Sequence, residues 1–139
     1  MLLEWTEALD LGVARMDATH REFVDQLNAL ADAADGDLLA GLDAFIAHTE
    51  EHFAQEERWM KGTSFPPLHC HADEHAGVLG IMREVRGYVS AGRIDLGRVL
   101  VRELAPWFTN HAATMDTMLA RFLSVNGIDP DGIAAESAS

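Results

Sequence analysis

The sequence predicts an all-α fold: an up-down-up-down antiparallel four-helix bundle with an irregular N-terminal arm, forming one domain over residues 1–139. The first observation is composition, because Ala, Leu, Glu and Asp are abundant and runs of β-branched residues are few, which favours helix over sheet. The second is that apolar residues recur at helical spacing in four segments. The third is that the connections between these segments are short, so successive helices should pack antiparallel around a single core.

The arm is predicted to cover residues 1–16, and the first helix about residues 18–35. Asp17 is a candidate N-cap, because its side chain can accept a hydrogen bond from a backbone N–H of the first turn. Apolar residues then follow at helical spacing: Phe23, Val24, Leu27 and Leu30. An Ala-Asp cluster before Gly36 ends the helix.

The second helix is predicted over about residues 38–61, after Asp37 and with Gly62 as its terminator. The third spans about residues 67–90, since the Pro-Pro pair at 66–67 suits a first helical turn, where a missing N–H does no harm. Where they are exposed, three glycines weaken this helix by about 1 kcal/mol each relative to Ala: Gly77, Gly80 and Gly87.

The fourth helix is predicted over about residues 96–125, with Asp95 as its cap and an Asn-Gly pair after its end. Pro106 lies inside this helix and removes a hydrogen bond to the carbonyl of Arg102, so we expect a kink there. The tail covers residues 128–139, and its last six residues, AAESAS, should fray.

The charge and the lack of long apolar runs exclude several classes of protein. A formal net charge of −13 argues against nucleic acid and anionic lipid as partners, because like charges repel. The first ten residues, MLLEWTEALD, do not resemble a secretory signal, and no apolar run approaches the roughly 20 residues that span a bilayer. A membrane-embedded protein is therefore not expected. The single cysteine, Cys70, forms no internal disulfide, which suits a cytoplasmic location.

Histidines and carboxylates recur at spacings that suit a metal site. In FPPLHCHADEH, His71 and His75 are four residues apart and therefore lie one turn apart on one helix face. His52 and Glu56 repeat this spacing on the second helix. A histidine on the first helix and a His/Asp pair on the fourth complete a set drawn from all four helices. The candidate ligands are His20, His52, Glu56, His71, His75, His111 and Asp116.

The neighbours of these histidines place them on the apolar stripes of their helices, facing the core. A single histidine on such a face is most often a core residue with a backbone hydrogen bond. Five histidines and two carboxylates are a different case, because each unsatisfied buried polar group costs about 1–3 kcal/mol. Metal coordination would satisfy the whole set at once, and we therefore predict a metal centre.

Two histidines of this region fall outside the pattern. His48 lies one turn before His52 on the same face but further from Glu56, which places it in an outer layer of contacts or at the bundle surface. His69 is six residues from His75 and therefore points to another side of the helix. We expect neither to bind metal.

The spacing of the pair on the fourth helix is unusual. His111 and Asp116 are five residues apart, which is roughly 140° around an ideal helix. Either Asp116 reaches the site from the flank, or the helix widens locally in a π-bulge. The sequence is compatible with both.

The donor types favour iron. Imidazoles and carboxylates without a thiolate suit iron, copper or zinc better than magnesium or calcium. Seven ligands are too many for one tetrahedral zinc, but they suit two metals about 3.5–4 Å apart, bridged by the two carboxylates. When two Fe(II) ions bind oxygen as hydroperoxide and become Fe(III), a proton moves from a bridging hydroxide to the oxygen. The net charge of the buried site then stays constant, so oxygen can bind and leave without placing extra charge in an apolar interior. This favours iron and reversible oxygen binding.

The segments HFAQEE, HADEH and WFTNHAATMD, with RMDATH upstream, resemble the hemerythrin family, in particular single-domain bacteriohemerythrins. The resemblance spans Trp5 to about Leu123, and all seven ligand positions hold the expected residue type. It implies two iron ions per chain, with a bridging oxo or hydroxo group, and O2 as ligand. It also implies a four-helix bundle.

The resemblance further assigns each ligand to a metal. It implies that His71, His75 and His111 hold one iron ion. It implies that His20 and His52 hold the other, which is left open to oxygen. Two carboxylates would bridge the ions: Glu56 and Asp116.

The implied function is reversible dioxygen binding for oxygen storage, transport or delivery, for example to an oxygen-consuming enzyme, by a monomer that is not itself an enzyme. The alternatives are a di-iron enzyme or a redox or oxygen sensor acting on O2, peroxide or NO, and an iron homeostasis protein. Five histidines favour binding, whereas ferritin-like oxidases use mostly carboxylates. Judged by their helix faces, the candidate walls of an oxygen pocket, each also compatible with ordinary core packing, are Phe23, Leu27, Leu104, Trp107 and Met115.

Overall fold

The structure, a computed structural model, describes residues 1–133, so the AAESAS segment predicted to fray lies outside the described residues. It confirms the all-α four-helix bundle, and the described residues contain no strand. The long helices are α1 (Ala14–Asp32), α2 (Leu38–Gly62), α3 (Leu68–Ser90) and α4 (Ile94–His111), which continues through a π-helix (Ala112–Asp116) into α5 (Thr117–Val125). Short 3-10 turns lie at Glu7–Leu9, Asp35–Asp37 and Pro130–Gly132.

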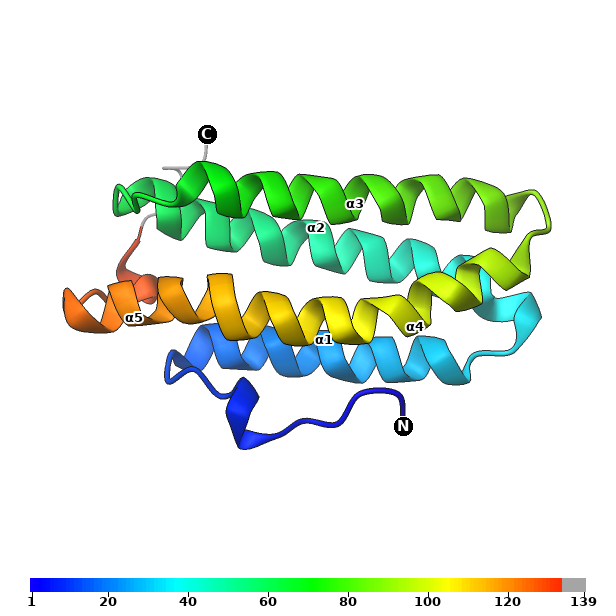
Figure 1. The fold of residues 1–139 in the computed structure, drawn as a ribbon, viewed down its shortest axis with the longest axis horizontal. Helices are drawn as coiled ribbons and strands as arrows, with labels where there is room; N and C mark the ends of the chain where they lie inside the picture. The colour runs from blue at the N-terminus through cyan, green and yellow to red at the C-terminus, as the bar shows by residue number, and fades with distance from the viewer. Residues whose placement is uncertain (134–139) are drawn as a thin grey trace.

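The long helices run side by side, each antiparallel to the next in the chain (Figure 1). Helix α1 packs against α2 and α4, and α3 packs against the same two helices, so all four surround one interior. The N-terminal arm lies along α1, where the side-chain amide of Asn28 accepts a hydrogen bond from the N–H of Leu3 and donates one to its carbonyl. No described helix is both long enough and apolar enough to cross a membrane.

The start of α1 differs from the prediction. The helix begins at Ala14, inside the predicted arm of residues 1–16, and Asp17 therefore lies in the first turn instead of capping it. The Asp17 carboxylate accepts hydrogen bonds from the backbone N–H groups of Leu11 and Gly12, at 2.8 and 3.1 Å. These bonds hold the turn that leads into the helix. The turn favours glycine, because Gly12 has a φ of 82°.

Other boundaries differ less. Helix α1 ends at Asp32, a few residues earlier than predicted, because Ala33 is extended and a 3-10 turn follows. Helix α4 begins at Ile94 with Arg93 at the N-cap position, so the prediction that Asp95 caps this helix was wrong. Asp95 lies in the first turn and forms an ion pair with Arg93 at 2.9 Å. Helices α2 and α3 lie within one residue of their predicted bounds.

Pro106 lies inside α4 without ending it. The helix is continuous from Ile94 to His111. Figure 1 shows its N-terminal part inclined to the remainder, as expected for a helix with an internal proline. The C-terminal part runs alongside α1 and leads directly into the π-helix.

Two apolar clusters fill the interior. The long cluster includes Leu38, Leu42, Phe45, Met82, Leu100 and Val101, together with Phe53 nearer the middle of the bundle. The short cluster consists of Val13, Met16, Trp59, Met60, Phe65, Leu119, Ala120 and Leu123. On α2, Glu56 stands between Phe53 of the long cluster and Trp59 of the short cluster. Buried polar side chains on α1 and α3 occupy the same intermediate position, so a polar layer separates the two clusters.

Candidate metal centre

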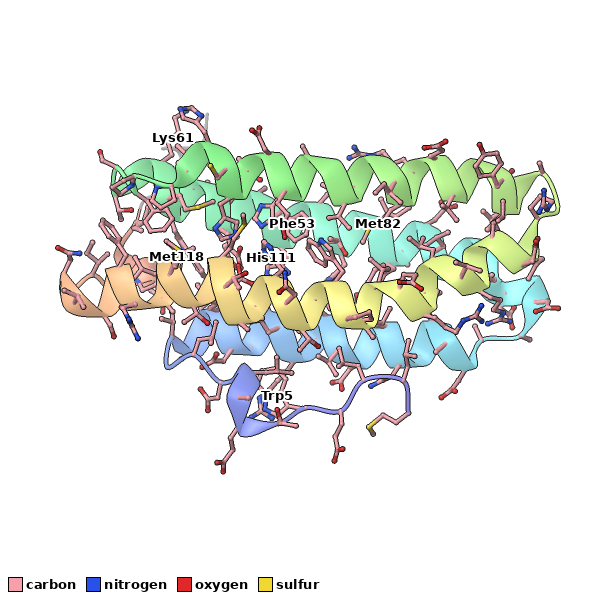
Figure 2. The ribbon with its side chains drawn as sticks, in the orientation of Figure 1. Trp5, Phe53, Lys61, Met82, His111 and Met118 are labelled. Carbon is pink, nitrogen blue, oxygen red and sulfur yellow. The ribbon has the colours of Figure 1, made fainter. Side chains whose placement is uncertain are left out.

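All seven side chains predicted to bind metal meet in this polar layer. Each is almost fully buried, and the most exposed, His52, keeps only 6% of its surface. They come from every long helix: His20 on α1, His52 and Glu56 on α2, His71 and His75 on α3, His111 at the end of α4, and Asp116 at the end of the π-helix. Figure 2 shows His111 in the interior, in the same region as Phe53 of α2.

The π-helix explains how the unusual pair on the fourth helix shares one face. Its five residues, Ala112–Asp116, widen the turn, so that a spacing of five brings the second side chain back over the first. Nε2 of His111 lies 3.1 Å from Oδ1 of Asp116. The carbonyl of Ala112 accepts the backbone N–H of Thr117, as expected for a π-helix, and the hydroxyl of Thr117 donates to the same carbonyl at 2.7 Å. Of the two alternatives left open by the sequence, the structure has the π-helix.

Glu56 directs its two oxygens at different imidazoles. Oε1 lies 3.4 Å from Nε2 of His71 and 3.4 Å from Nε2 of His75. Oε2 lies 3.0 Å from Nε2 of His52 and 3.5 Å from Nε2 of His20. One carboxylate therefore faces two groups of nitrogen donors.

The two carboxylate oxygens of Asp116 also face different imidazoles. Its Oδ1 lies 3.0 Å from Nε2 of His71 and 3.1 Å from Nε2 of His111, whereas Oδ2 lies 3.1 Å from Nε2 of His20. Two sets of donors result, with all ligand atoms of a set within 4.8 Å of one another. The three-histidine set is Glu56, His71, His75, His111 and Asp116. The two-histidine set is His20, His52 and Glu56.

Many atoms of this layer have no hydrogen-bond partner. The unpartnered buried atoms facing the centre are Nε2 of His20, His71, His75 and His111, Oε1 of Glu56 and Oδ1 of Asp116. Left unsatisfied, each buried polar group costs about 1–3 kcal/mol. Imidazole nitrogens and carboxylate oxygens in sets of this size are suitable ligands for first-row transition metals. The residues therefore fit a pair of metal ions, with Glu56 and Asp116 able to serve both.

The carboxylates and imidazoles also stabilise each other's charges. Burial would raise the pKa of Glu56, but the facing imidazoles, including His52 and His20, hold this pKa well below its usual range. Burial would lower the pKa of His20, but Asp116 and Glu56 raise it to about 10. The pKa of His71 is raised to about 9 by the same balance. Without metal, the protons on these imidazoles compensate the buried carboxylates, and a metal ion would displace them.

The structure adds residues that the sequence interpretation did not identify. Nδ1 of His75 is hydrogen bonded to Glu57 at 3.0 Å, and Nδ1 of His111 to Glu74 at 2.9 Å. Phe53 stacks on the His75 ring, with centroids 3.8 Å apart and planes 2° apart. The only sequence signal for the two glutamates was their position beside ligands, in HFAQEE and HADEH. Their partners lie on other helices, so spacing alone could not reveal them.

Of the predicted pocket-wall residues, two take part in aromatic contacts at or beside the candidate ligands. Trp107 is half-buried and stacks on His111, with centroids 4.7 Å apart and planes 11° apart. Phe23 stacks on Phe108 at 4.5 Å, and Phe108 meets the His20 ring edge-to-face at 5.3 Å. Phe108 is therefore in direct contact with the candidate ligand His20, and Phe23 packs behind it. Three further members complete the predicted set: Leu27 and Leu104 are buried, and Met115 is half-buried in the π-helix.

The structure places His48 and His69 outside the cluster. Nε2 of His48 pairs with Glu22 at 3.0 Å, and both line a pocket of about 160 Å³ whose wall includes the ligand candidate His52. His69 is exposed on α3, as is Cys70. The donor sets therefore contain the seven predicted residues and neither of these histidines.

Comparison with known proteins identifies the family. Residues 11–123, which make up most of the chain, match the family described as Hemerythrin HHE cation binding domain. The chain belongs to the hemerythrin family. This confirms the resemblance seen in the sequence.

The hemerythrin relatives align along most of their own length. A bacteriohemerythrin of Ralstonia nicotianae is 51% identical over 128 residues, covering 92% of this chain and 93% of the relative. A bacteriohemerythrin of Aquifex aeolicus is 28% identical over 131 residues, covering 88% and 98%. A myohemerythrin of Theromyzon tessulatum is 25% identical over 113 residues, covering 81% and 87%. Family membership supports a non-haem iron protein that binds oxygen.

Proposed function

We propose that this chain binds dioxygen reversibly at a non-haem di-iron centre, for oxygen storage, transport or delivery. The observation that carries the proposal is the division of Glu56 and Asp116, each of which directs one oxygen at each group of imidazoles. Two ions held in this way would share both carboxylates. When bound, the iron pair supplies the electrons that reduce dioxygen and takes them back when it is released.

The chain's own residues would make the two metal positions different. His71, His75 and His111 offer three imidazoles to one position, and His20 and His52 offer two to the other. The two-histidine position therefore has room for a ligand from outside the protein. Phe108 packs against His20 and brings the long apolar cluster up to this side of the centre. A dry wall of this kind would keep water from the site and slow irreversible oxidation.

The ratio of imidazole to carboxylate ligands favours reversible oxygen binding over catalytic turnover of oxygen. Five imidazoles and two carboxylates make a centre with little negative charge, so Fe(III) is less strongly stabilised than in carboxylate-rich oxidase sites. The oxygen could be delivered to an oxygen-consuming enzyme. The monomeric state and the cytoplasmic location remain predictions.

The test is anaerobic reconstitution with Fe(II), metal analysis, exposure to air, and removal of the oxygen. We expect about two iron ions per chain and a visible absorption band that appears with oxygen and disappears without it. Zinc-loaded protein is the matched control and should show no band. Irreversible bleaching, or turnover with a reductant, would support a di-iron enzyme. A content of about one zinc per chain in protein purified without added metal would contradict both.

A further inference from the structure

The outer nitrogens of the imidazoles distinguish the two donor sets. In the three-histidine set, Nδ1 of His75 and Nδ1 of His111 each donate to a carboxylate, that of Glu57 and that of Glu74. In the two-histidine set, Nδ1 of His20 is buried without a partner. Among the described residues, the His52 ring is hydrogen bonded only through Nε2. Outer carboxylates therefore support one metal position and not the other.

Both carboxylates reach across to a neighbouring helix. Glu57 on α2 contacts His75 on α3, and Glu74 on α3 contacts His111 on α4. Their side chains remain 41% and 29% exposed, so water solvates the oxygens that face outward. The negative charge can therefore be kept at the rim of the site, whereas the ligands themselves are fully buried.

The same two imidazoles are also held on their faces. Phe53 stacks on His75, and Trp107 stacks on His111. The third imidazole of the set, His71, has neither support: its Nδ1 is buried without a partner, and its ring neighbours are other histidines. An aromatic face and a carboxylate at Nδ1 together determine both the plane and the rotation of a ring.

We infer that Glu57 and Glu74 are positioning residues that make the two metal positions electronically unequal. Each carboxylate holds its histidine with the proton on Nδ1, which leaves Nε2 free to bind metal, and it makes the imidazole a stronger electron donor. Stronger electron donation stabilises the oxidised metal ion. A metal at the three-histidine position is therefore easier to oxidise than it would be if the partners at Nδ1 were uncharged. The inference rests on the proposed di-iron function and specifies which position receives this support.

The test uses Glu57→Gln, Glu74→Gln and the double variant, which keep the side-chain size and remove the charge. The control is the double variant Asp43→Asn and Glu84→Gln, which removes two charges from exposed positions on the same two helices. Iron-loaded proteins are compared by Fe(II) affinity, by anaerobic redox titration, and by Mössbauer spectra, which resolve the two positions. The metal-free proteins are compared by thermal unfolding.

For the double variant we expect Fe(II) affinity to fall by about 10–100-fold, the usual range for outer partners of metal ligands. The reduction potential should rise, and the Mössbauer parameters should change at one of the two iron positions only. The control should match the wild type in Fe(II) affinity, reduction potential and Mössbauer parameters, although it removes the pair between Asp43 and Arg86 that joins α2 to α3. Equal changes at both positions, or a lower unfolding temperature with unchanged potential and affinity, would overturn the inference, because the glutamates would then only join helices.

A second measurement does not depend on oxygen or iron chemistry. In zinc-loaded protein, the Nδ1 protons of His75 and His111 should give two protected downfield proton resonances. Glu57→Gln should shift only the first and Glu74→Gln only the second. If neither shifts, the inference fails even where the wild type takes up two irons and binds oxygen reversibly. If the wild type binds no metal pair, the inference fails together with the proposed function.

Discussion

The long apolar cluster and the polar layer beside it are equally buried, but the interactions that their side chains make are different. Leu42 and Met82 have no exposed surface, and neither has His20. The side chains of the long cluster satisfy one another by close packing. Those of the polar layer leave nitrogen and oxygen atoms without partners. Burial alone therefore does not define a finished core, since the atoms of one region are satisfied within the chain and the other region leaves donor atoms that metal ions could satisfy.

The order of these regions along the bundle has a consequence for the metal-free protein. Apolar clusters lie on both sides of the polar layer. The long cluster joins α1, α2, α3 and α4, and the short cluster joins α1, α2 and α5, with Leu68 at the start of α3 packed against it. The layer also compensates its own charges, because the pKa values of His20 and His71 are raised while that of Glu56 is lowered. We therefore expect a metal-free protein that folds, is less stable than the loaded one, and presents the ligands nearly in place.

Removing one ligand should have the largest effect. We expect His75→Ala to bind less than the full iron content and to lose much of the stabilisation that iron gives. It should lose about 2–5 kcal/mol more, the range for truncating a large buried side chain, because Phe53 would lose the ring on which it stacks and Glu57 its imidazole partner. Metal analysis and urea unfolding of the iron-treated protein measure the two effects.

The control for this variant is His69→Ala, which removes an exposed histidine from the same helix. It should keep the wild-type iron content and stability. Stoichiometric iron in His75→Ala would count against the assignment of His75 as a ligand. Equal losses in both variants would mean that α3 itself, and not the site, had been damaged.

A cavity in the long cluster should separate stability from metal binding. Leu42→Ala should lower the free energy of unfolding by about 2–5 kcal/mol, the range for a fully buried leucine. Iron content should stay at the wild-type value, because Leu42 belongs to the long cluster and to neither donor set. Urea unfolding and metal analysis of the same samples test this. If the variant is fully folded but binds less iron than the wild type, the long cluster and the polar layer are coupled.

The apolar region was the more predictable of the two. Periodicity located all four helices, because each buries one stripe of side chains. It could not place the start of α1, because Asp17 serves the preceding turn through its contacts with Leu11 and Gly12. It also misplaced the start of α4, where Asp95 pairs with Arg93 instead of capping. Such choices depend on which local partner an aspartate meets.

The ligand candidates were predictable from spacing, but their surroundings were not. The pairs four residues apart share a face in any α-helix, whereas the pair His111 and Asp116 was compatible with two backbones. Glu57 and Glu74 act on histidines of neighbouring helices, so their role depends on how the helices are rotated in the bundle. A single sequence contains that information only through the whole packing.

The pH dependence of stability should have opposite directions in the two metal states. Raised histidine pKa values contribute stability to the metal-free protein that is fully present below about pH 6.5, the unfolded value. This contribution is lost as the pH rises through about 9 for His71 and about 10 for His20. The loaded protein should instead lose stability as the pH falls, because protons compete with metal for the imidazoles.

Urea unfolding of metal-free and zinc-loaded protein between about pH 6 and 10 measures both trends. Leu42→Ala is the control: its stability should be lower throughout but should follow the same pH dependence as the wild type. A metal-free protein whose stability does not change over this range would contradict the charge compensation inferred for the polar layer.

The smallest effect should come from glycines, and its sign should differ between two positions. A Cβ on Gly80, exposed on α3, would meet no atom within 4 Å, so Gly80→Ala should raise the free energy of unfolding by about 0.5–1 kcal/mol. A Cβ on Gly97 of α4 would lie 2.7 Å from Val89 and 2.9 Å from Leu38, so Gly97→Ala should destabilise despite the better helix propensity. Both should keep full iron content in metal analysis. If Gly80→Ala instead changes iron affinity, then flexibility of α3 contributes to the site, and the separation between the polar layer and its scaffold is less complete than the packing indicates.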